Sequence, residues 1–270
     1  MTHLIETEHP STMRDVLDGR ARWCVVEGDC LDVMADIPDG AVDHVITDPP
    51  FTQRTSDNMR SRKDPSDGGA YIGDSGRRHI DFDGIDGMEP ALTRLFLACS
   101  KRWVVAFCAL EQIGTYAAAA GTSWVRGTVW HRTNSAPQFT GDRPGQACEG
   151  VAIMHRKGRK RWNRGGHSLL WRGPTVNAVN DTSRGIEHPT VKPLWLMQDS
   201  IEAFTDPNDL ILDPFAGSGT TGVAALRLGR RVILIEREPK WAELCRERLR
   251  AEETGSTLQA ARAGQEPLFK

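Results

Sequence analysis

Several features that would place this chain in a special class of protein are missing from its 270 residues. No apolar run approaches the roughly 20 residues that a membrane-spanning helix needs. The first residues carry neither a basic segment nor an apolar signal core, which favours a cytoplasmic protein. The six cysteines form no C-x-x-C pair, and most fall in apolar runs, which argues against a disulfide scaffold and against a metal site.

Bulk composition is ordinary, with 39% apolar and 26% charged residues, and the length suffices for one large α/β domain with a small appended lobe. A net charge of −2 argues against a protein that coats nucleic acid non-specifically.

Acidic residues are absent from one stretch, residues 150–180, where cations gather instead. This basic tract is either a solvated charged loop or a surface that contacts phosphates. The interleaved Trp162, His167 and Trp171 favour phosphate contact. The candidate phosphate-binding residues are Arg156, Lys157, Arg159, Lys160, Arg161, Trp162 and Arg164.

Short apolar strands alternate with helical patterns in both halves of the chain, which is typical of a mostly parallel sheet with helices on both faces. The alternation breaks over residues 132–185, where we expect loops and one further strand at 150–154. The predicted strands are 23–28, 42–47, 102–108, 124–131, 209–213 and 232–236. The predicted helices are 30–37, 88–100, 111–120, 194–204, 220–228 and 239–251.

A first unusual string, Thr47–Phe51 (TDPPF), follows the predicted strand at 42–47. Consecutive prolines cannot continue a strand ladder, so the strand stops there. Asp48 and the Pro49 carbonyl are suited to accept the two hydrogens of an exocyclic amino group and so free its lone pair. The Phe51 ring offers a face on which a planar base can stack. The alternative is an edge turn with a helix-capping aspartate.

A second string, Asp213–Thr220 (DPFAGSGT), joins a predicted strand to a predicted helix. Glu236 ends the next strand, 19 positions after Gly217. A glycine turn followed about 20 residues later by an acid is how a doubly wound fold holds a nucleoside. Gly217, Gly219 and Gly222 have the spacing of the G-x-G-x-x-G dinucleotide fingerprint, but the flanking Asp213-Pro214-Phe215 points away from a dinucleotide site. The alternative is a plain strand-to-helix turn.

Together the two strings resemble the signature motifs of the amino-group DNA methyltransferases, of N6-adenine or N4-cytosine type. Their order, with the catalytic string first, resembles the permuted beta subgroup. The resemblance spans residues 23–250 and is sharpest at 27–51 and 188–236. It implies a doubly wound, mostly parallel α/β sheet, the Rossmann-like S-adenosylmethionine-dependent methyltransferase fold in permuted order, with a small irregular recognition insert.

The resemblance also implies a division of the chain. Its parts are a leader (1–21), a catalytic half (22–131), a target-recognition insert (132–187), a cofactor-binding half (188–254) and a loose tail (255–270). Independently of the resemblance, residues 52–80 have few apolar anchors and form either a mobile flap over the site or a disordered stretch. Their position directly after the catalytic string favours a functional loop.

By resemblance, the catalytic residues are Asp48, Pro49, Pro50 and Phe51. The glycine turn would pass under the methionine part of S-adenosylmethionine, and Glu236 would bind its ribose. Lys192 would lie near the methionine carboxylate. Asp29 either accepts from the adenine amino group or caps the following helix, or does both. The implied cofactor-binding residues are Asp29, Thr190, Lys192, Asp213, Phe215, Ala216, Gly217, Ser218, Gly219, Thr220 and Glu236.

The implied function is site-specific methylation of the adenine amino group (N6) in double-stranded DNA, because Asp at the first catalytic position is typical of adenine enzymes. The alternatives are N4-cytosine methylation of DNA, methylation of RNA or of a protein amide, and a non-catalytic DNA-binding protein. No Pro-Cys dipeptide is present, which argues against carbon-5 cytosine methylation. A cognate endonuclease is a candidate partner, and the protein would be a monomer or a homodimer without membrane contact.

Overall fold

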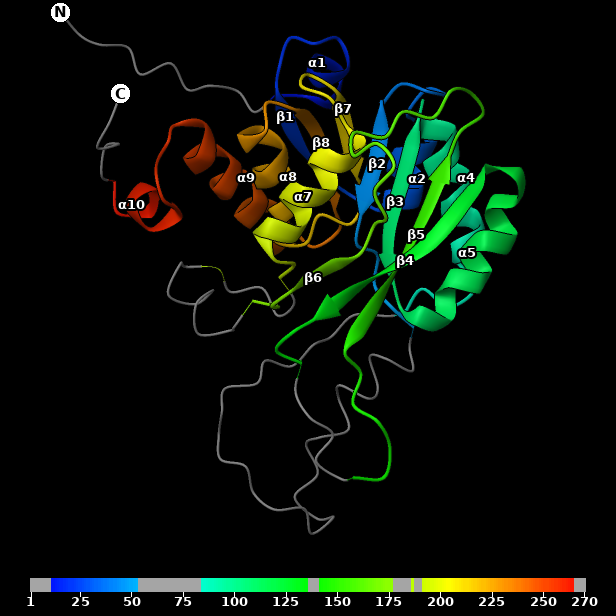
Figure 1. Ribbon diagram of the computed structural model, residues 1–270. Coiled ribbons are helices and arrows are strands. Elements are labelled where there is room, and N and C mark those ends of the chain that lie inside the picture. The colour runs from blue at the N-terminus through cyan, green and yellow to red at the C-terminus, as the bar shows by residue number, and fades with distance from the viewer. Residues whose placement is uncertain (1–10, 53–83, 136–140, 177–185, 187–190, 265–270) are drawn as a thin grey trace, which may run out of the picture.

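A computed structural model describes residues 11–52, 84–135, 141–176, 186 and 191–264 of the chain. An eight-stranded sheet runs through it in the order β1-β8-β7-β2-β3-β5-β4-β6 (Figure 1). Every neighbouring pair is parallel except β3–β5 and β4–β5, so the expected mostly parallel α/β sheet is confirmed. The strands are β1 (Trp23–Glu27), β2 (His44–Thr47), β3 (Trp103–Cys108), β4 (Trp124–Arg132), β5 (Cys148–His155), β6 (Trp171–Gly173), β7 (Leu210–Asp213) and β8 (Arg231–Glu236).

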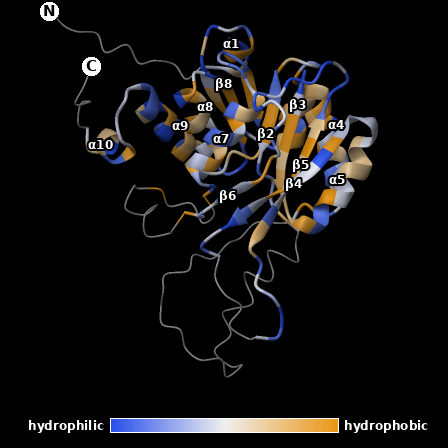
Figure 2. Ribbon diagram, viewed as in Figure 1, coloured by the Kyte–Doolittle hydropathy of each residue, from blue (hydrophilic) through white to orange (hydrophobic). Residues whose placement is uncertain are grey.

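Helices cover both faces of the sheet, and each face has its own apolar core. Successive residues of a strand point to opposite faces, so Val45 of β2 packs in one core and Ile46 in the other. Figure 2 shows hydrophobic residues along the central strands and a mixture of hydrophobic and hydrophilic residues along the helices. One face carries α7 (Leu194–Phe204), α8 (Thr220–Arg227) and α9 (Pro239–Glu253); the other carries α1 (Met13–Leu17), α2 (Cys30–Ala35), α4 (Glu89–Cys99) and α5 (Ile113–Ala120).

Burial on both faces explains why the strands are continuously apolar in sequence. The predicted helices and strands are all present, with ends that differ by a few residues. Gly229 follows Leu228, the C-cap of α8, and has a φ of +71°, the left-handed conformation in which glycine commonly ends a helix. A short 3-10 turn, η3 (Leu110–Gln112), precedes α5, and another, η4 (Gly121–Ser123), follows it.

The prediction of a single strand within residues 132–185 is wrong, because the structure has both β5 and β6 there. β5 is more than a part of an irregular insert, since it pairs along most of its length with β3 and with β4. β6 has three residues, too few for a periodic pattern to show in the sequence. The predicted recognition insert, residues 132–187, therefore contains residues 148–155, which belong to the sheet and not to a separate lobe.

The expected loose tail is partly wrong as well. Residues Leu258–Arg262 form α10, in which Leu258 is buried and Arg262 pairs with Glu247 of α9 at 2.6 Å. At the other end of the chain, α1 is fixed by a capping box between Thr12 and Asp15 and buries Val16.

Over the described ranges, no helix is long and apolar enough to cross a membrane. The same ranges hold no group of three or more side chains arranged to bind a metal ion.

The strands that carry the two unusual strings are direct neighbours. β2 pairs in parallel with β7, with Val45 opposite Leu212. Both strands therefore end at the same side of the sheet, called here the carboxyl edge, and the opposite side is called the amino edge. Ligands of open α/β sheets bind outside the carboxyl ends of the strands.

Candidate active site

The catalytic string begins where β2 ends. Thr47 is the last residue of β2, and Asp48 follows it at the carboxyl edge with 27% of its side chain exposed. Burial raises the pKa of Asp48, and the ammonium of Lys192, 2.9 Å from Asp48 Oδ1, opposes that rise. The structure thus brings a half-buried carboxylate to the edge where a ligand would bind.

One hydrogen bond joins the catalytic string to the glycine turn. Thr47 Oγ1 donates to Asp213 Oδ1 at 2.7 Å, and the backbone N–H of Phe215 donates to the same oxygen at 3.1 Å. Asp213 is 2% exposed, and burial raises its pKa to about 6 despite these hydrogen bonds. Its carboxylate therefore holds the two strings together, a role that the sequence did not indicate; direct contact of Asp213 with the cofactor stays a prediction.

The glycine turn between β7 and α8 requires glycine at two positions. Gly217 and Gly219 have φ values of +52° and +80°, which side chains rarely adopt. A Cβ on Gly219 would also lie 3.1 Å from Cys245 Sγ of α9. The thiol of Cys245 in turn donates to the Gly217 carbonyl at 3.1 Å. The turn is therefore fixed against α9 and has no room for larger residues.

The remaining residues of the turn are largely covered by the protein. Ala216, Ser218 and Thr220 are 7%, 4% and 5% exposed. Arg248, on α9, donates to the Ser218 carbonyl. Phe215, the large side chain of the turn, is partly buried and packs against the core that contains Val45. Contact of these residues with the cofactor stays a prediction.

Glu236 ends β8 beside the turn. Its Oε2 accepts from the backbone N–H of Gly217 at 2.8 Å, and its Oε1 accepts from the N–H of Glu238 at 2.9 Å. Burial raises its pKa above the ordinary value. Each carboxylate oxygen has a further lone pair, so Glu236 can still accept from the hydroxyls of a ribose.

Asp29 lies at the end of the neighbouring strand. β1 pairs with β8, and the N–H of Gly28 donates to the Glu236 carbonyl at 3.0 Å. The Asp29 side chain accepts from the N–H of Leu31 at 2.8 Å and begins α2, which confirms its capping role. Contact with an adenine amino group stays a prediction. A glycine turn flanked by two acids at adjacent strand ends fits the nucleoside of S-adenosylmethionine.

Lys192 occupies a position that the sequence did not predict. Its Nζ lies 2.9 Å from Asp48 Oδ1 and 2.6 Å from Glu149 Oε2. The same ammonium lies over aromatic rings at 5.1 Å (Phe51), 5.3 Å (Phe107) and 5.7 Å (Trp130) from their centroids. Lys192 therefore lies inside the catalytic side of the site. Contact with the methionine carboxylate is untested, and Thr190 lies outside the described residues.

Glu149, on β5, is a site residue that the sequence reasoning did not single out. Its Oε2 contacts Lys192, and its Oε1 lies 3.4 Å from Nη1 of Arg132, the last residue of β4. In the sequence, the one feature that marks Glu149 is that it is a lone acidic residue before a continuous apolar run. That signal does not identify the lysine 43 residues later as its partner.

The candidate phosphate-binding residues of the basic tract, at 156–164, lie at the amino edge, away from Asp48. β5 runs antiparallel to β3, with His155 opposite Trp103, so the residues after His155 emerge at the start of β3. Lys157, Arg159 and Lys160 are exposed. Three of the other predicted phosphate contacts form ion pairs within the protein: Arg156 with Asp39, Arg161 with Asp206 and Arg164 with Asp199.

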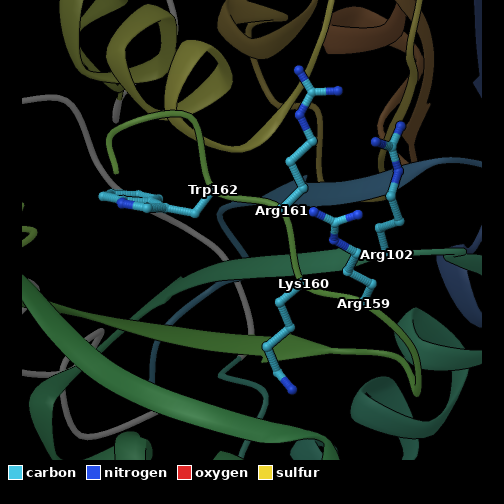
Figure 3. Close-up of a pocket in the computed structure, with 5 residues that line it drawn as sticks. All are labelled: Arg102, Arg159, Lys160, Arg161 and Trp162. Carbon is cyan, nitrogen blue, oxygen red and sulfur yellow. The ribbon is translucent and has the colours of Figure 1, made fainter. Parts of the chain in front are cut away.

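Part of this tract lines a pocket at the amino edge. The pocket is lined by Arg102, Arg159, Lys160, Arg161 and Trp162. Figure 3 shows the side chains of three arginines pointing to one side, while Lys160 and Trp162 point elsewhere. Trp162 packs against Phe204 with ring centroids 5.3 Å apart. Phosphate contact by the residues of this tract stays a prediction.

Known proteins resemble this chain in sequence. A model of the DNA methylase family of N6/N4 type matches residues 121–247. YubD of Escherichia coli (strain K12), named as a methylase, is 33% identical over 232 residues, covering 84% of this chain and 89% of that protein. The type II methyltransferase M.HinfI of Haemophilus influenzae is 28% identical over 246 residues, covering 84% and 68%.

Solved structures share the fold. The M1.HpyAVI–SAM complex has a TM-score of 0.60 at 23% identity and covers 84% of this chain and 100% of that chain. The PvuII DNA methyltransferase, described as cytosine-N4-specific, has a TM-score of 0.60 at 15% identity and covers 92% and 95%. With the sequence matches, the two linked strings lead to one conclusion: the chain belongs to the N6/N4 DNA methylase family, the S-adenosylmethionine-dependent amino-group DNA methyltransferases.

Proposed function

We propose that this protein transfers the methyl group of S-adenosylmethionine to the N6 amino group of adenine at specific sites in double-stranded DNA. The Thr47–Asp213 hydrogen bond supports this proposal most, because it joins the catalytic string to the glycine turn at the ends of adjacent strands. A methyl donor on the turn and an amino group at Asp48 would then meet at one edge of the sheet.

Asp48 and the Pro49 carbonyl supply the chemistry of the acceptor side. An exocyclic amino group is a poor nucleophile because its lone pair is delocalised into the ring. Two oxygen acceptors for its two hydrogens draw the nitrogen toward tetrahedral geometry. The bound cofactor supplies an electrophilic methyl group. Asp48 then takes the proton that the methylated nitrogen must lose, so no covalent enzyme intermediate is needed.

The base must leave the duplex to reach this edge. Phe51 offers a ring on which an extruded base can stack, as predicted from the sequence. Asp48 at the first position favours adenine over cytosine by the family resemblance, and N4-cytosine is the second candidate. The fold neighbour described as cytosine-N4-specific does not decide between the bases, because its identity of 15% reflects the fold.

Identification of the modified nucleoside tests the proposal. Mixed-sequence duplex DNA is incubated with the protein and S-adenosylmethionine, digested, and its nucleosides identified by mass. N6-methyladenine is expected, and N4-methylcytosine would refute the choice of base. Parallel reactions with RNA and with protein must show no comparable incorporation. The Asp48→Ala variant should bind the cofactor in a calorimeter and show no turnover; near wild-type turnover would refute the assigned chemistry.

The setting of the reaction is part of the proposal. We expect a cytoplasmic enzyme that acts as a monomer or homodimer, with a cognate endonuclease as candidate partner. Sedimentation with and without duplex DNA decides the oligomeric state.

A further inference from the structure

Four side chains of alternating charge form a line across the carboxyl edge: Arg132, Glu149, Lys192 and Asp48. The contacts in this order are 3.4, 2.6 and 2.9 Å. Their exposed side-chain fractions are 24%, 12%, 13% and 27%. The four residues come from four separate segments, so only the folded sheet brings them together.

Lys192 is the centre of this line. Burial on its own lowers the pKa of Lys192, and the charges of Asp48 and Glu149 raise it above the ordinary value, so the ammonium persists. Cations are attracted to the faces of aromatic rings, and Phe51, Phe107 and Trp130 supply three such rings within 5.7 Å. The ammonium is held by more groups than a single ion pair with Asp48 would provide.

We propose that Glu149 is a positioning residue for Asp48. It holds the Lys192 ammonium against Asp48 Oδ1, and this contact keeps the catalytic carboxylate ionised and oriented as the amino-group acceptor. The inference rests on the proposed function, because it assigns Asp48 the acceptor role.

Electrostatics gives the reason for the arrangement. A protonated Asp48 would donate a hydrogen bond where the reaction requires an acceptor. Removing Lys192 alone would leave two carboxylates in a partly buried site with no cation between them, and a charge whose partner is lost is strongly unfavourable. Removing both Lys192 and the Glu149 charge would relieve that repulsion. The titratable or charged groups that act on Asp48 or respond to its charge are Lys192, Glu149, Cys108, Tyr116 and Asp213.

The competing role for Lys192 is contact with the methionine carboxylate, which was the expectation from sequence. The two roles predict different kinetics. A cofactor ligand controls KM for S-adenosylmethionine and acts independently of Glu149. A positioning cation controls the acid limb of the pH profile of kcat, and its effect depends on Glu149.

The test compares Lys192→Met, Glu149→Gln and the double variant, using total methyl incorporation into duplex DNA against pH at saturating substrates. Lys192→Met should move the acid limb upward by about 1 to 3 pH units. Glu149→Gln should lower kcat by about tenfold with unchanged KM for the cofactor, as expected when a hydrogen bond to a charged group is lost. The acid limb of the double variant should lie at lower pH than that of Lys192→Met, part of the way back to the wild-type position.

Two controls keep the result interpretable. Lys101→Met removes an exposed lysine that pairs with Asp43 at 3.0 Å at the amino edge, and it should leave the acid limb unchanged. Thermal unfolding and calorimetric cofactor binding show that each variant folds. A raised cofactor KM with an unmoved acid limb, and no recovery in the double variant, would overturn the inference.

A second measurement separates this inference from the proposed function. Total incorporation counts either base, so an N4-cytosine product would refute adenine and leave the comparison of variants intact. If no methyl transfer occurs, ¹³C NMR titration of the Asp48 carboxyl, assigned with Asp48→Asn, decides instead. The pKa of Asp48 should rise in Lys192→Met and return part of the way in the double variant; an unchanged pKa would overturn the inference.

Discussion

Aspartates at the two edges of the sheet differ in how many of their hydrogen-bond acceptor sites the protein itself occupies. At the amino edge, Asp209 accepts from Arg102 Nη2 at 2.6 Å, from His44 Nε2 at 3.0 Å and from the Asp206 N–H at 2.7 Å. At the carboxyl edge, Asp48 is held by one ammonium and is more exposed. A fully bonded carboxylate fixes structure, whereas a carboxylate with spare acceptor capacity is available to a substrate.

The pKa values follow the same division. Partial burial raises the pKa of Asp209, but its hydrogen bonds from His44 and the Asp206 N–H outweigh burial and hold it at about 2. Burial raises the pKa of Asp48 and that of Asp213, the latter to about 6. Raised carboxyl pKa values are frequent where chemistry occurs, and here they gather at one edge.

The largest expected effect comes from Asp48→Asn. The amide keeps the shape of the side chain and removes its charge, so turnover should fall by about 10² to 10³-fold, the range seen when a charge-stabilising group is lost. Calorimetry should show near wild-type cofactor affinity. Asp209→Asn is the matched control at the amino edge, and equal losses of turnover per folded molecule would break the distinction between the edges.

Asp213→Asn tests the buried link between the strings. The pKa of Asp213 is about 6 in the folded protein and about 3.9 when unfolded. The folded state therefore binds the extra proton between these values, and the free energy of unfolding falls by about 2 kcal/mol as pH rises from 4 to 6. The Asn variant should lack this decrease. Urea unfolding across this pH range measures the decrease. If the free energy of unfolding depends on pH in the same way in the wild type and in Asp213→Asn, the raised pKa does not belong to Asp213.

Asp209→Asn should act on stability with the opposite sign of pH dependence. The depressed pKa, about 2, means that the carboxylate stabilises the fold above pH 4 and that this contribution is lost as pH falls toward 2. At pH 7 the variant should lose about 2 kcal/mol in free energy of unfolding. Denaturant unfolding at pH 7 measures the loss, and an unchanged midpoint would show that the Arg102–His44 cluster is not needed.

The smallest effect is expected from Arg159→Ala combined with Lys160→Ala. If both contact phosphates, the slope of log affinity for duplex DNA against log salt should decrease by about 1 to 2. Turnover at saturating DNA should stay unchanged because these residues lie far from Asp48 along the strands. Arg14→Ala on α1, with an exposed side chain (77%), is the control. An identical salt slope in the variant would limit DNA contact to the carboxyl edge.

The sequence predicted those parts of the site that are contiguous in the chain. Thr47–Phe51 and Asp213–Thr220 each carry their own turn chemistry, and the strands before them are apolar on both faces, so their position at one edge followed from topology. The acid at the end of β8 followed from its spacing to Gly217.

The parts that the sequence did not predict depend on tertiary contacts. Glu149 meets Lys192 only because β5 lies within the sheet. Residues 156–164 lie at the amino edge because β5 runs antiparallel to β3, and strand direction cannot be read from composition. The helix α10 has one buried apolar side chain, too weak a signal to separate it from a polar tail.

The hydroxyl of Thr47 and the carboxylate of Asp213 stand 166 positions apart in the chain and touch at 2.7 Å. Strand pairing and one short bond thereby hold the catalytic string and the glycine turn in fixed register at the carboxyl edge. A substitution that shifts β2 against β7 would therefore move both strings relative to each other, even if it changes no residue of either string.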